Sequence, residues 1–356
     1  MIHNFNAGPS ILPDVVLQEA AKAVLNFNET GLSILEIGHR TPLFESVLDE
    51  ARSLVRELMN LGPEYEVLFL HGGGTTQFME VPMNLLDETG TAAYIDTGVW
   101  SSKAISYAKQ FGKVDVVASS QDKNYTYIPR QFSVKPGTAY LHITTNNTIY
   151  GTEWHNIPST NGVPLVADMS SDILSREMDY SRFDLIYAGA QKNIGAAGTT
   201  LTVVKRSALG HVQRKIPGIL DYQKHIEAGS MLNTPPVFAI YVSMLTLRWL
   251  KAQGGVAAID QANTQKAALL YGALDRLPVF SPTVVKEDRS RMNACFVMKD
   301  PALEQAFAAR CKEAGMYGIK GHRSVGGFRI SLYNALPLSS VKDIVSLMED
   351  FAKQHG

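Results

Sequence analysis

A single lysine stands at the end of an apolar run, among residues too small to cover its amine. Lys192 lies in AGAQKNIGAAG, which continues the apolar run at 185–188. A second apolar run, 165–167, ends at Asp168, 192 − 168 = 24 positions earlier. Ammonium groups are rarely buried without a partner, so this setting favours a Schiff-base lysine that presents its amine to a cofactor aldehyde. Pyridoxal phosphate needs a lysine on its aldehyde and usually an aspartate on its ring nitrogen, so this pair predicts a site for that cofactor.

Three loops that follow other apolar runs add groups able to hold a phosphate or an aromatic ring. HGGGTTQF at 71–78 passes through three glycines into a helical pattern, where free N–H groups and the helix dipole favour an anion. It lacks the lysine of a nucleoside triphosphate loop and the spacing of a dinucleotide fingerprint. Trp100 can stack on a ring, and Thr148 offers a hydroxyl. Each feature alone is also typical of ordinary structure: a surface lysine, a helix N-cap, a tight turn, a core tryptophan.

Two histidine–arginine pairs indicate ligands with more than one anionic group. The pairs are His39–Arg40 and His322–Arg323, and Arg329 follows the second pair inside an apolar strand pattern. An arginine fork matches a carboxylate or phosphate through two parallel hydrogen bonds, which a lysine cannot reproduce. A surface arginine needs no explanation, but an arginine within an apolar pattern favours an anionic partner.

The elements that position these residues alternate between strand and helix patterns. Strand-like apolar runs occupy 66–70, 92–95, 114–118, 139–143, 165–167, 185–188 and 200–204, with helical spacing at 78–86 and 101–111. This alternation predicts an α/β fold with a mostly parallel sheet and helices on both faces. Between 189 and 200 there is no room for a crossover helix, so that pair of strands should be antiparallel. The expected core is a mixed, mostly parallel seven-stranded sheet whose strand ends carry the site.

The pattern changes beyond Gly254 and Gly255. A long amphipathic helix at 256–277 precedes a strand at 292–298, a helix at 302–314, a strand at 328–332 and a helix at 341–353. Ser340 and Asp343 could cap that last helix. We expect a large domain over 1–255 and a smaller C-terminal α/β domain over 256–356. The N-terminal arm, about residues 1–15, can pack with the smaller domain.

Composition excludes several classes of function. Among 356 residues, 33 Lys plus Arg stand against 34 Asp plus Glu, so no global field draws the chain to nucleic acid or an anionic membrane. The longest apolar segment, 237–250, is too short to span a bilayer. Cys295 and Cys311 have no metal-ligand spacing and indicate reduced core thiols. We therefore expect a cytoplasmic protein without a metal site.

With these residues in place, the chain resembles the phosphoserine aminotransferase family, fold-type I pyridoxal phosphate enzymes of the class V aminotransferase group. The similarity runs from NFNAGP at 4–9 almost to the C-terminus. The segments that carry it are 39–40, 72–78, 97–100, 167–171, 188–192, 233–236 and 321–329.

The resemblance implies a role for each matching position. Lys192 would hold the cofactor and move a proton between the substrate Cα and the cofactor, and Asp168 would keep the ring nitrogen protonated. The other implied cofactor contacts are Trp100 on the ring, Thr148, and Gly74, Thr75 and Gln191 at the phosphate, with Asn233 and Thr234 from the other subunit of a homodimer. The implied substrate contacts are Arg329 at the α-carboxylate and His39, Arg40, His322 and Arg323 around the distal anion, the last two reaching across the dimer.

The implied reaction is a ping-pong amino transfer between L-glutamate and 3-phosphohydroxypyruvate, which gives O-phospho-L-serine and 2-oxoglutarate. Members of the family often also accept 4-phosphohydroxy-L-threonine, an intermediate of pyridoxine biosynthesis. The alternatives are another fold-type I aminotransferase, such as a serine or alanine–glyoxylate aminotransferase, and a non-enzymatic phosphate-binding module that uses the glycine turn alone. A cysteine desulfurase or lyase of the same fold needs a thiol on an active-site loop. It is disfavoured, because Cys295 lies in an apolar strand pattern and Cys311 in a helical one.

Overall fold

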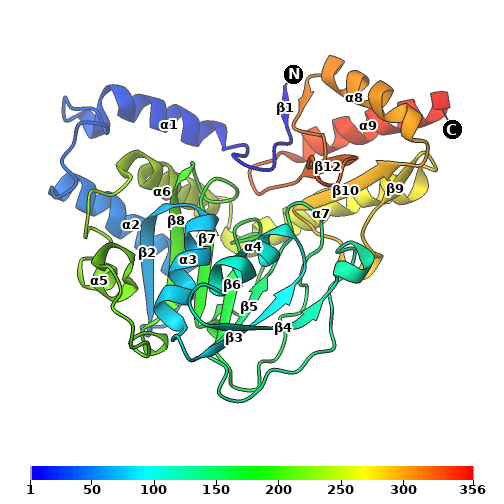
Figure 1. Cartoon of the computed structure of the whole chain (residues 1–356). Helices are drawn as coiled ribbons and strands as arrows, with labels where there is room; N and C mark the ends of the chain where they lie inside the picture. Colours follow the sequence, from blue (N-terminus) through cyan, green and yellow to red (C-terminus); the bar gives the residue numbers. More distant parts are fainter. Residues whose placement is uncertain (1, 356) are drawn as a thin grey trace.

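A seven-stranded sheet forms the centre of the larger part of the molecule (Figure 1). The computed structural model describes residues 2–355. The strands of this sheet are β2 (Tyr65–Gly72), β3 (Thr91–Asp96), β4 (Lys113–Ser119), β5 (Leu141–Thr144), β6 (Leu165–Asp168), β7 (Leu185–Gly189) and β8 (Gly198–Lys205). Their order is β2-β8-β7-β6-β5-β3-β4. All the strands predicted for this sheet are confirmed, with ends that shift by a few residues.

Strand β8 runs antiparallel to both of its neighbours, β2 and β7, while β7, β6, β5, β3 and β4 are mutually parallel. The connection from Gly189 to Gly198 is too short for a crossover helix, so the chain turns back beside β7. The predicted antiparallel pair is confirmed. This tight connection carries Lys192 at the carboxyl edge of the sheet.

Helices cover both faces of the sheet, as predicted. They are α1 (Asp14–Leu25), α2 (Pro42–Leu58), α3 (Gly74–Leu85), α4 (Val99–Ala108), α5 (Tyr222–Glu227) and α6 (Val237–Ala252). Successive side chains of a strand point to opposite faces. In β2, Val67 and Phe69 therefore join the core under α1, α2 and α6, whereas Leu68 and Leu70 join the core under α3, α4 and α5.

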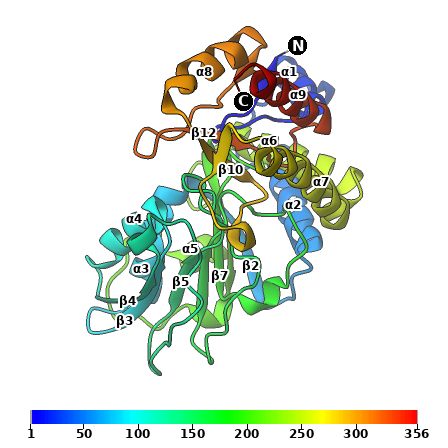
Figure 2. The same ribbon diagram turned by 90° about the vertical axis from the view of Figure 1, so that its right-hand side faces the viewer.

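The C-terminal elements lie together above the large sheet in both ribbon views (Figures 1 and 2). They are α7 (Gly255–Arg276), β9 (Phe280–Pro282), β10 (Asn293–Met298), α8 (Glu304–Glu313), β11 (Met316–Tyr317), β12 (Phe328–Ser331) and α9 (Leu338–His355). An antiparallel sheet of order β12-β10-β9 lies among them. The N-terminal strand β1 (His3–Asn4) pairs with β11. Phe5 packs into the hydrophobic core that these C-terminal elements form.

Some sequence expectations for the helices were wrong in detail. Helix α9 begins at Leu338, directly after Pro337, so Ser340 lies inside its first turn and is not a cap. The Ser340 hydroxyl instead lies 3.0 Å from His3 Nδ1. Helices α1, α2, α5 and α6 were not predicted. Cys295 and Cys311 are free, buried thiols, as expected, and burial raises the pKa of each to about 12. The division into domains 1–255 and 256–356 stays a prediction.

Across residues 2–355, no helix combines the length and apolar character that crossing a bilayer requires.

Candidate active site

Residues from four strand ends meet at the carboxyl edge of the large sheet. Asp168 ends β6, Lys192 follows β7, Thr148 follows β5, and Trp100 lies in the first turn of α4 after β3. Ligands of open α/β sheets bind at this edge. One cavity there is lined by Gly74, Thr75, Phe78, Trp100, Thr144, Asn146, Thr148, Asp168, Ser170, Ser171, Gln191 and Lys192. It gathers every predicted cofactor residue except Asn233 and Thr234.

The amine of Lys192 reaches into this cavity beside one hydroxyl. Lys192 Nζ donates to Thr148 Oγ1 at 2.8 Å and lies 5.9 Å from the centre of the Trp100 ring. Burial lowers the pKa of Lys192 to about 8; the charge of Arg329 adds to this effect and that of Asp168 opposes it. Such an amine is partly unprotonated near neutral pH, so it can act as a nucleophile and a base.

The carboxylate of Asp168 is buried at the floor of the cavity, with 5% of the residue exposed. Its Oδ1 accepts the N–H of Ser170 at 2.9 Å. Burial raises the pKa of Asp168, and the hydrogen bonds from Ser170 and the charge of Lys192 oppose this shift. A buried carboxylate with so few donors is suited to receive a cationic N–H from a ligand.

The glycine-rich turn sets the start of α3 against Ser170. Gly74 and Thr75 begin this 12-residue helix, whose first backbone N–H groups have no partner within the helix. A Cβ added at Gly74 would lie 3.0 Å from Ser170 Oγ, so a larger residue would displace that hydroxyl. Ser170 Oγ in turn accepts the N–H of Gly189 at 3.1 Å. Together with Gln191, this wall is suited to a phosphate group.

Two side chains near the cavity carry a buried N–H group that has no partner within residues 2–355. Among the described residues, Trp100 Nε1 and Arg329 Nε are buried and make no hydrogen bond. Arg329 lies in β12, and its Nη1 donates to the backbone oxygen of Thr148 at 3.0 Å. Thr148 thus contacts Lys192 with its hydroxyl and Arg329 with its carbonyl. Buried donors are normally satisfied, so these two favour a ligand that brings acceptors.

The donor set fits pyridoxal phosphate. It offers an amine of lowered pKa for the aldehyde, a buried acid for the ring nitrogen, an indole for the ring and a helix start for the phosphate. Within residues 2–355, no group of three or more His, Cys, Asp or Glu side chains is arranged to hold a metal ion.

The two histidine–arginine pairs lie outside the wall of this cavity. His39–Arg40 precedes α2, and His322–Arg323 lies in the loop before β12; both arginines are exposed. Burial and the charges of Arg329, Arg323 and Lys103 lower the pKa of His322. The second pair therefore belongs to a group of cations around Arg329, whereas the first pair lies apart from the cavity.

Asn233 and Thr234 also lie outside the cavity wall, in the segment before α6. Thr234 is exposed, and its backbone oxygen lies 2.6 Å from Nε2 of His71 at the end of β2. In one chain, this segment contributes nothing to the cavity.

Sequence analysis missed three polar residues that shape the site. Ser10 contacts the lysine loop: its hydroxyl donates to Lys192 O and its N–H donates to Gln191 O at 2.9 Å. Asn146 lines the cavity and donates to Ser171 Oγ at 2.8 Å. Ser170 had a visible signal, because it follows Asp168 within two residues. Ser10 had none, because 182 positions separate it from Lys192.

Comparisons with known proteins agree with this geometry. Residues 2–344 match the family model described as aminotransferase class-V. The chain is 56% identical over 348 residues to the phosphoserine aminotransferase of Flavobacterium johnsoniae, which covers 98% of each chain. A solved phosphoserine aminotransferase from Bacillus circulans subsp. alkalophilus matches with a TM-score of 0.97 and 41% identity over 100% of this chain and 99% of that one. A pyridoxal phosphate-bound phosphoserine aminotransferase from Trichomonas vaginalis matches with a TM-score of 0.93 and 33% identity, over 98% and 100%.

Proposed function

The chain belongs to the class-V aminotransferases and, within them, to the phosphoserine aminotransferase family, and from this membership we propose its reaction and the residues that perform it. It is a pyridoxal phosphate-dependent aminotransferase of fold type I. It exchanges the amino group between L-glutamate and 3-phosphohydroxypyruvate, giving O-phospho-L-serine and 2-oxoglutarate in serine biosynthesis. The observation that carries this function is the Lys192 amine, of lowered pKa, in one cavity with Asp168. No feature of the site favours the phosphate-binding module or a glyoxylate aminotransferase.

Lys192 performs the central proton transfer in this proposal. The bound cofactor supplies a conjugated ring that accepts the electrons released at the substrate Cα. Lys192 would hold the cofactor covalently through Nζ and, once displaced by substrate, would take the Cα proton as a general base. A pKa of about 8 leaves part of the amine unprotonated near neutral pH, and the Thr148 hydroxyl at 2.8 Å orients it.

Asp168 and Trp100 would hold the nitrogen and one face of the cofactor ring. The Asp168 carboxylate would pair with the ring nitrogen and keep it protonated, which is supported by its burial and single backbone donor. The Trp100 indole would stack on the ring, supported by its place in the cavity wall.

The start of α3 would bind the cofactor phosphate. Gly74 and Thr75 offer unpaired N–H groups there, and Gln191 lines the same wall. We assign Asn233 and Thr234 to the site of the partner subunit, because they lie outside the cavity of their own chain.

The arginines would recognise the two anions that the substrates share. Arg329 reaches toward Thr148 with its Nε free, so it suits the α-carboxylate common to both substrates. His39, Arg40, His322 and Arg323 would hold the distal phosphate or carboxylate, with the last two acting across the dimer. Arg40 and Arg323 are exposed in a single chain, which supports completion of this subsite by a partner.

The proposal therefore includes a two-fold homodimer with shared sites. Support comes from apolar side chains left exposed on α1 and the segment after it. These are Val15, Leu17, Leu25, Leu32 and Leu35. Apolar surface of this kind is characteristic of a protein interface. We also propose a cytoplasmic location, supported by the two free thiols.

A substrate screen tests this function. Specificity constants should be compared for 3-phosphohydroxypyruvate, pyruvate, glyoxylate and oxaloacetate as acceptors, and for phosphoserine, 4-phosphohydroxy-L-threonine and serine as donors. A site built to bind a phosphate can reject an analogue without it by about 10⁴-fold, so serine should be a very poor donor. Similar constants for serine and phosphoserine would refute the phosphate assignment. Purified protein without a visible band that borohydride abolishes would instead favour a phosphate-binding module.

A further inference from the structure

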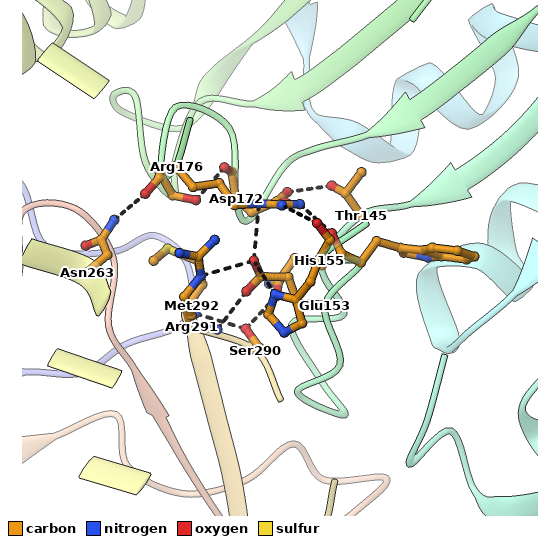
Figure 3. Close-up of polar contacts among 12 residues, drawn as sticks. Thr145, Glu153, His155, Asp172, Arg176, Asn263, Ser290, Arg291 and Met292 are labelled. Atoms are coloured by element: carbon orange, nitrogen blue, oxygen red, sulfur yellow. Dashed lines mark hydrogen bonds and ion pairs between the residues drawn. The ribbon is translucent and has the colours of Figure 1, made fainter. Parts of the chain in front are cut away.

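A buried carboxyl that the mechanism does not use lies one turn after Asp168. Asp172 is 2% exposed, in the turn that follows β6. Its Oδ1 lies 2.6 Å from Thr145 Oγ1, and the same hydroxyl lies 3.0 Å from the backbone oxygen of Asp168. Figure 3 shows the Thr145–Asp172 contact within a larger polar cluster. One hydroxyl thus joins Asp172 to the main chain of Asp168.

The number of hydrogens at this hydroxyl restricts the protonation of Asp172. A threonine hydroxyl carries one hydrogen, so Thr145 can donate fully to only one of these two oxygens. If Asp172 were ionised, both neighbours would be acceptors, and one contact would lack a hydrogen. If Asp172 carries a proton, it donates to Thr145, which donates to Asp168 O. Only the protonated acid places a hydrogen in both contacts, although Asp168 O also accepts the backbone N–H of Thr145 at 3.0 Å.

The second oxygen of Asp172 supports the same assignment. Among the described residues, Asp172 Oδ2 has no hydrogen-bond partner, and its nearest cation, Arg176 Nη2, lies 3.9 Å away. That guanidinium is already engaged: it donates to the backbone oxygens of Trp154 and His155 and lies 3.2 Å from Glu153 Oε1. A charged oxygen without a donor is far more costly to bury than the carbonyl oxygen of a neutral acid.

The surrounding charges already balance without Asp172. Glu153 pairs with Arg176 and also accepts the backbone N–H of Arg291 at 2.7 Å. Arg291 Nη1 pairs with Asp260 Oδ1 at 2.7 Å. Figure 3 draws Glu153, Arg176 and Arg291 in this arrangement. Two arginines therefore face two other carboxylates, and a charge on Asp172 would be in excess.

The environment acts on Asp172 in the same direction. Burial raises its pKa to about 7; the charges of Glu153 and Asp168 add to the shift, and Arg176 and the Thr145 hydrogen bond oppose it. The charged or titratable groups around it are Arg176 on its own turn, Glu153, Asp168, Tyr180, Lys192 and Tyr333. Asp168 and Asp172 repel each other when both are ionised. A proton on Asp172 therefore favours the ionised form of Asp168.

We propose that Asp172 is a positioning residue for the transamination: up to about neutral pH it carries a proton, holds the main chain of Asp168 through Thr145, and leaves Asp168 as the charged acid of the cavity. The role assigned to Asp168 rests on the proposed function. The protonation of Asp172 rests on the buried contacts alone, so the two can be tested separately.

The pH dependence of stability tests the protonation. A carboxyl whose pKa rises on folding from 3.8 to about 7 contributes stability that is complete below its unfolded pKa and lost as the pH rises through its folded pKa. The urea midpoint of the wild-type holoenzyme should therefore fall, relative to that of Asp172→Asn, between about pH 4 and about pH 7. A wild-type midpoint that stays level or rises against this variant would show an ionised, paired carboxylate and overturn the proposal.

Asp288→Asn is the matched control. Asp288 is equally buried, but its carboxylate accepts the N–H of Ile128 at 2.8 Å and pairs with Arg130. Its replacement should lower the midpoint at pH 7, because it removes a charged partner. Should Asp172→Asn fold poorly, infrared difference spectra of the Glu80→Gln holoenzyme across this pH range serve instead, because burial also raises the pKa of Glu80 to about 7. A protonated-carboxyl C=O band that disappears as the pH rises through about 7 is expected, and its absence at pH 5 would overturn the proposal.

Kinetics test the positioning role. Asp172→Ala and Thr145→Val each remove one member of the hydrogen-bonded pair and should lower kcat about tenfold, whereas Asp172→Asn and Thr145→Ser should recover most of that loss. A purely space-filling role predicts the opposite order at Thr145: no loss for valine, which has nearly the shape of threonine, and a loss for serine, which lacks the methyl group. Equal kcat for Thr145→Val and wild type would overturn the positioning role. A holoenzyme without the visible cofactor band would refute the proposed function instead, while the urea midpoints would still decide the protonation of Asp172.

Discussion

Two buried lysines in different parts of the molecule show what makes a lysine chemically available. Lys266, on α7, is 2% exposed, and burial lowers its pKa to about 7. Its Nζ donates to the backbone oxygens of Leu332, Tyr333 and Leu336 at 2.9, 2.7 and 3.1 Å. An ammonium group has three donors, so all of its hydrogens are used to hold the turn between β12 and α9.

Lys192 shares the lowered pKa but has a different set of contacts. Its pKa is lowered to about 8 by burial, and its one hydrogen-bond partner among the described residues is the Thr148 hydroxyl. The amine faces a cavity instead of a closed ring of carbonyls. Desolvation alone therefore does not make a catalytic lysine; the amine must also keep hydrogen-bonding capacity free for a ligand.

The largest expected difference between the two lysines is in turnover. Lys192→Ala should fold but lose transamination by about 10⁴-fold or more, together with the borohydride-sensitive visible band, because covalent attachment and proton transfer both need this amine. Lys266→Met should keep the band and instead lose about 1–3 kcal/mol of stability, since it leaves buried carbonyls without a donor. Near-normal transamination by Lys192→Ala would show that the site is wrongly assigned.

Chemical labelling of the apoprotein should separate the lysines by access. At about pH 8, roughly half of Lys192 is neutral, about 100-fold more than an ordinary lysine, so a small acylating reagent should modify it first. Its rate should fall as the pH drops below about 8, where the amine becomes protonated. Lys266 should stay unmodified despite its lowered pKa. Peptide mass spectrometry gives both rates, and faster labelling of Lys266 would contradict the comparison.

Arg329 resembles Lys192 in that only some of its hydrogen-bond donors have a partner among the described residues. Arg329→Lys should lower kcat/KM on the order of 10- to 100-fold for every substrate, because a point charge replaces a fork at the shared α-carboxylate. Changes at Arg40 or Arg323 should reduce kcat/KM most for phosphorylated substrates. The control is Arg310→Lys, on the exposed side of α8, which should leave kcat/KM unchanged. If Arg323→Ala lowers kcat/KM equally for phosphorylated and unphosphorylated substrates, Arg323 does not bind the distal anion.

The smallest expected effect tests whether the exposed cations serve the partner subunit. Lys192→Ala and an inactive Arg323 variant should each lack activity, yet a mixture that forms heterodimers should regain roughly a quarter of wild-type activity, because half the dimers carry one intact site of two. If both groups served their own chain, every site would keep a defect and mixing would restore nothing. Heterodimer formation must be confirmed with two affinity tags.

Local patterns in the sequence were sufficient for the framework of the site. Apolar runs predicted the strands of the large sheet, and the short link after Gly189 predicted the antiparallel position of β8. Asp168 and Lys192 were identified because they end such runs, and strand ends of a parallel sheet converge. These inferences needed only spacing of a few residues, which backbone geometry sets directly.

Only the tertiary structure decided which residues distant in sequence lie at the site and which lie away from it. The sequence does not distinguish the amine of Lys266 from that of a surface lysine on an amphipathic helix, and it does not place Ser10 against Lys192. In the sequence, Asp172 likewise looks like an ordinary turn residue. Only the fold brings it into contact with Thr145, 27 positions away. Burial, hydrogen-bond partners and pKa depend on which elements pack together. Because the whole core determines this packing, these properties cannot be predicted from a local sequence pattern.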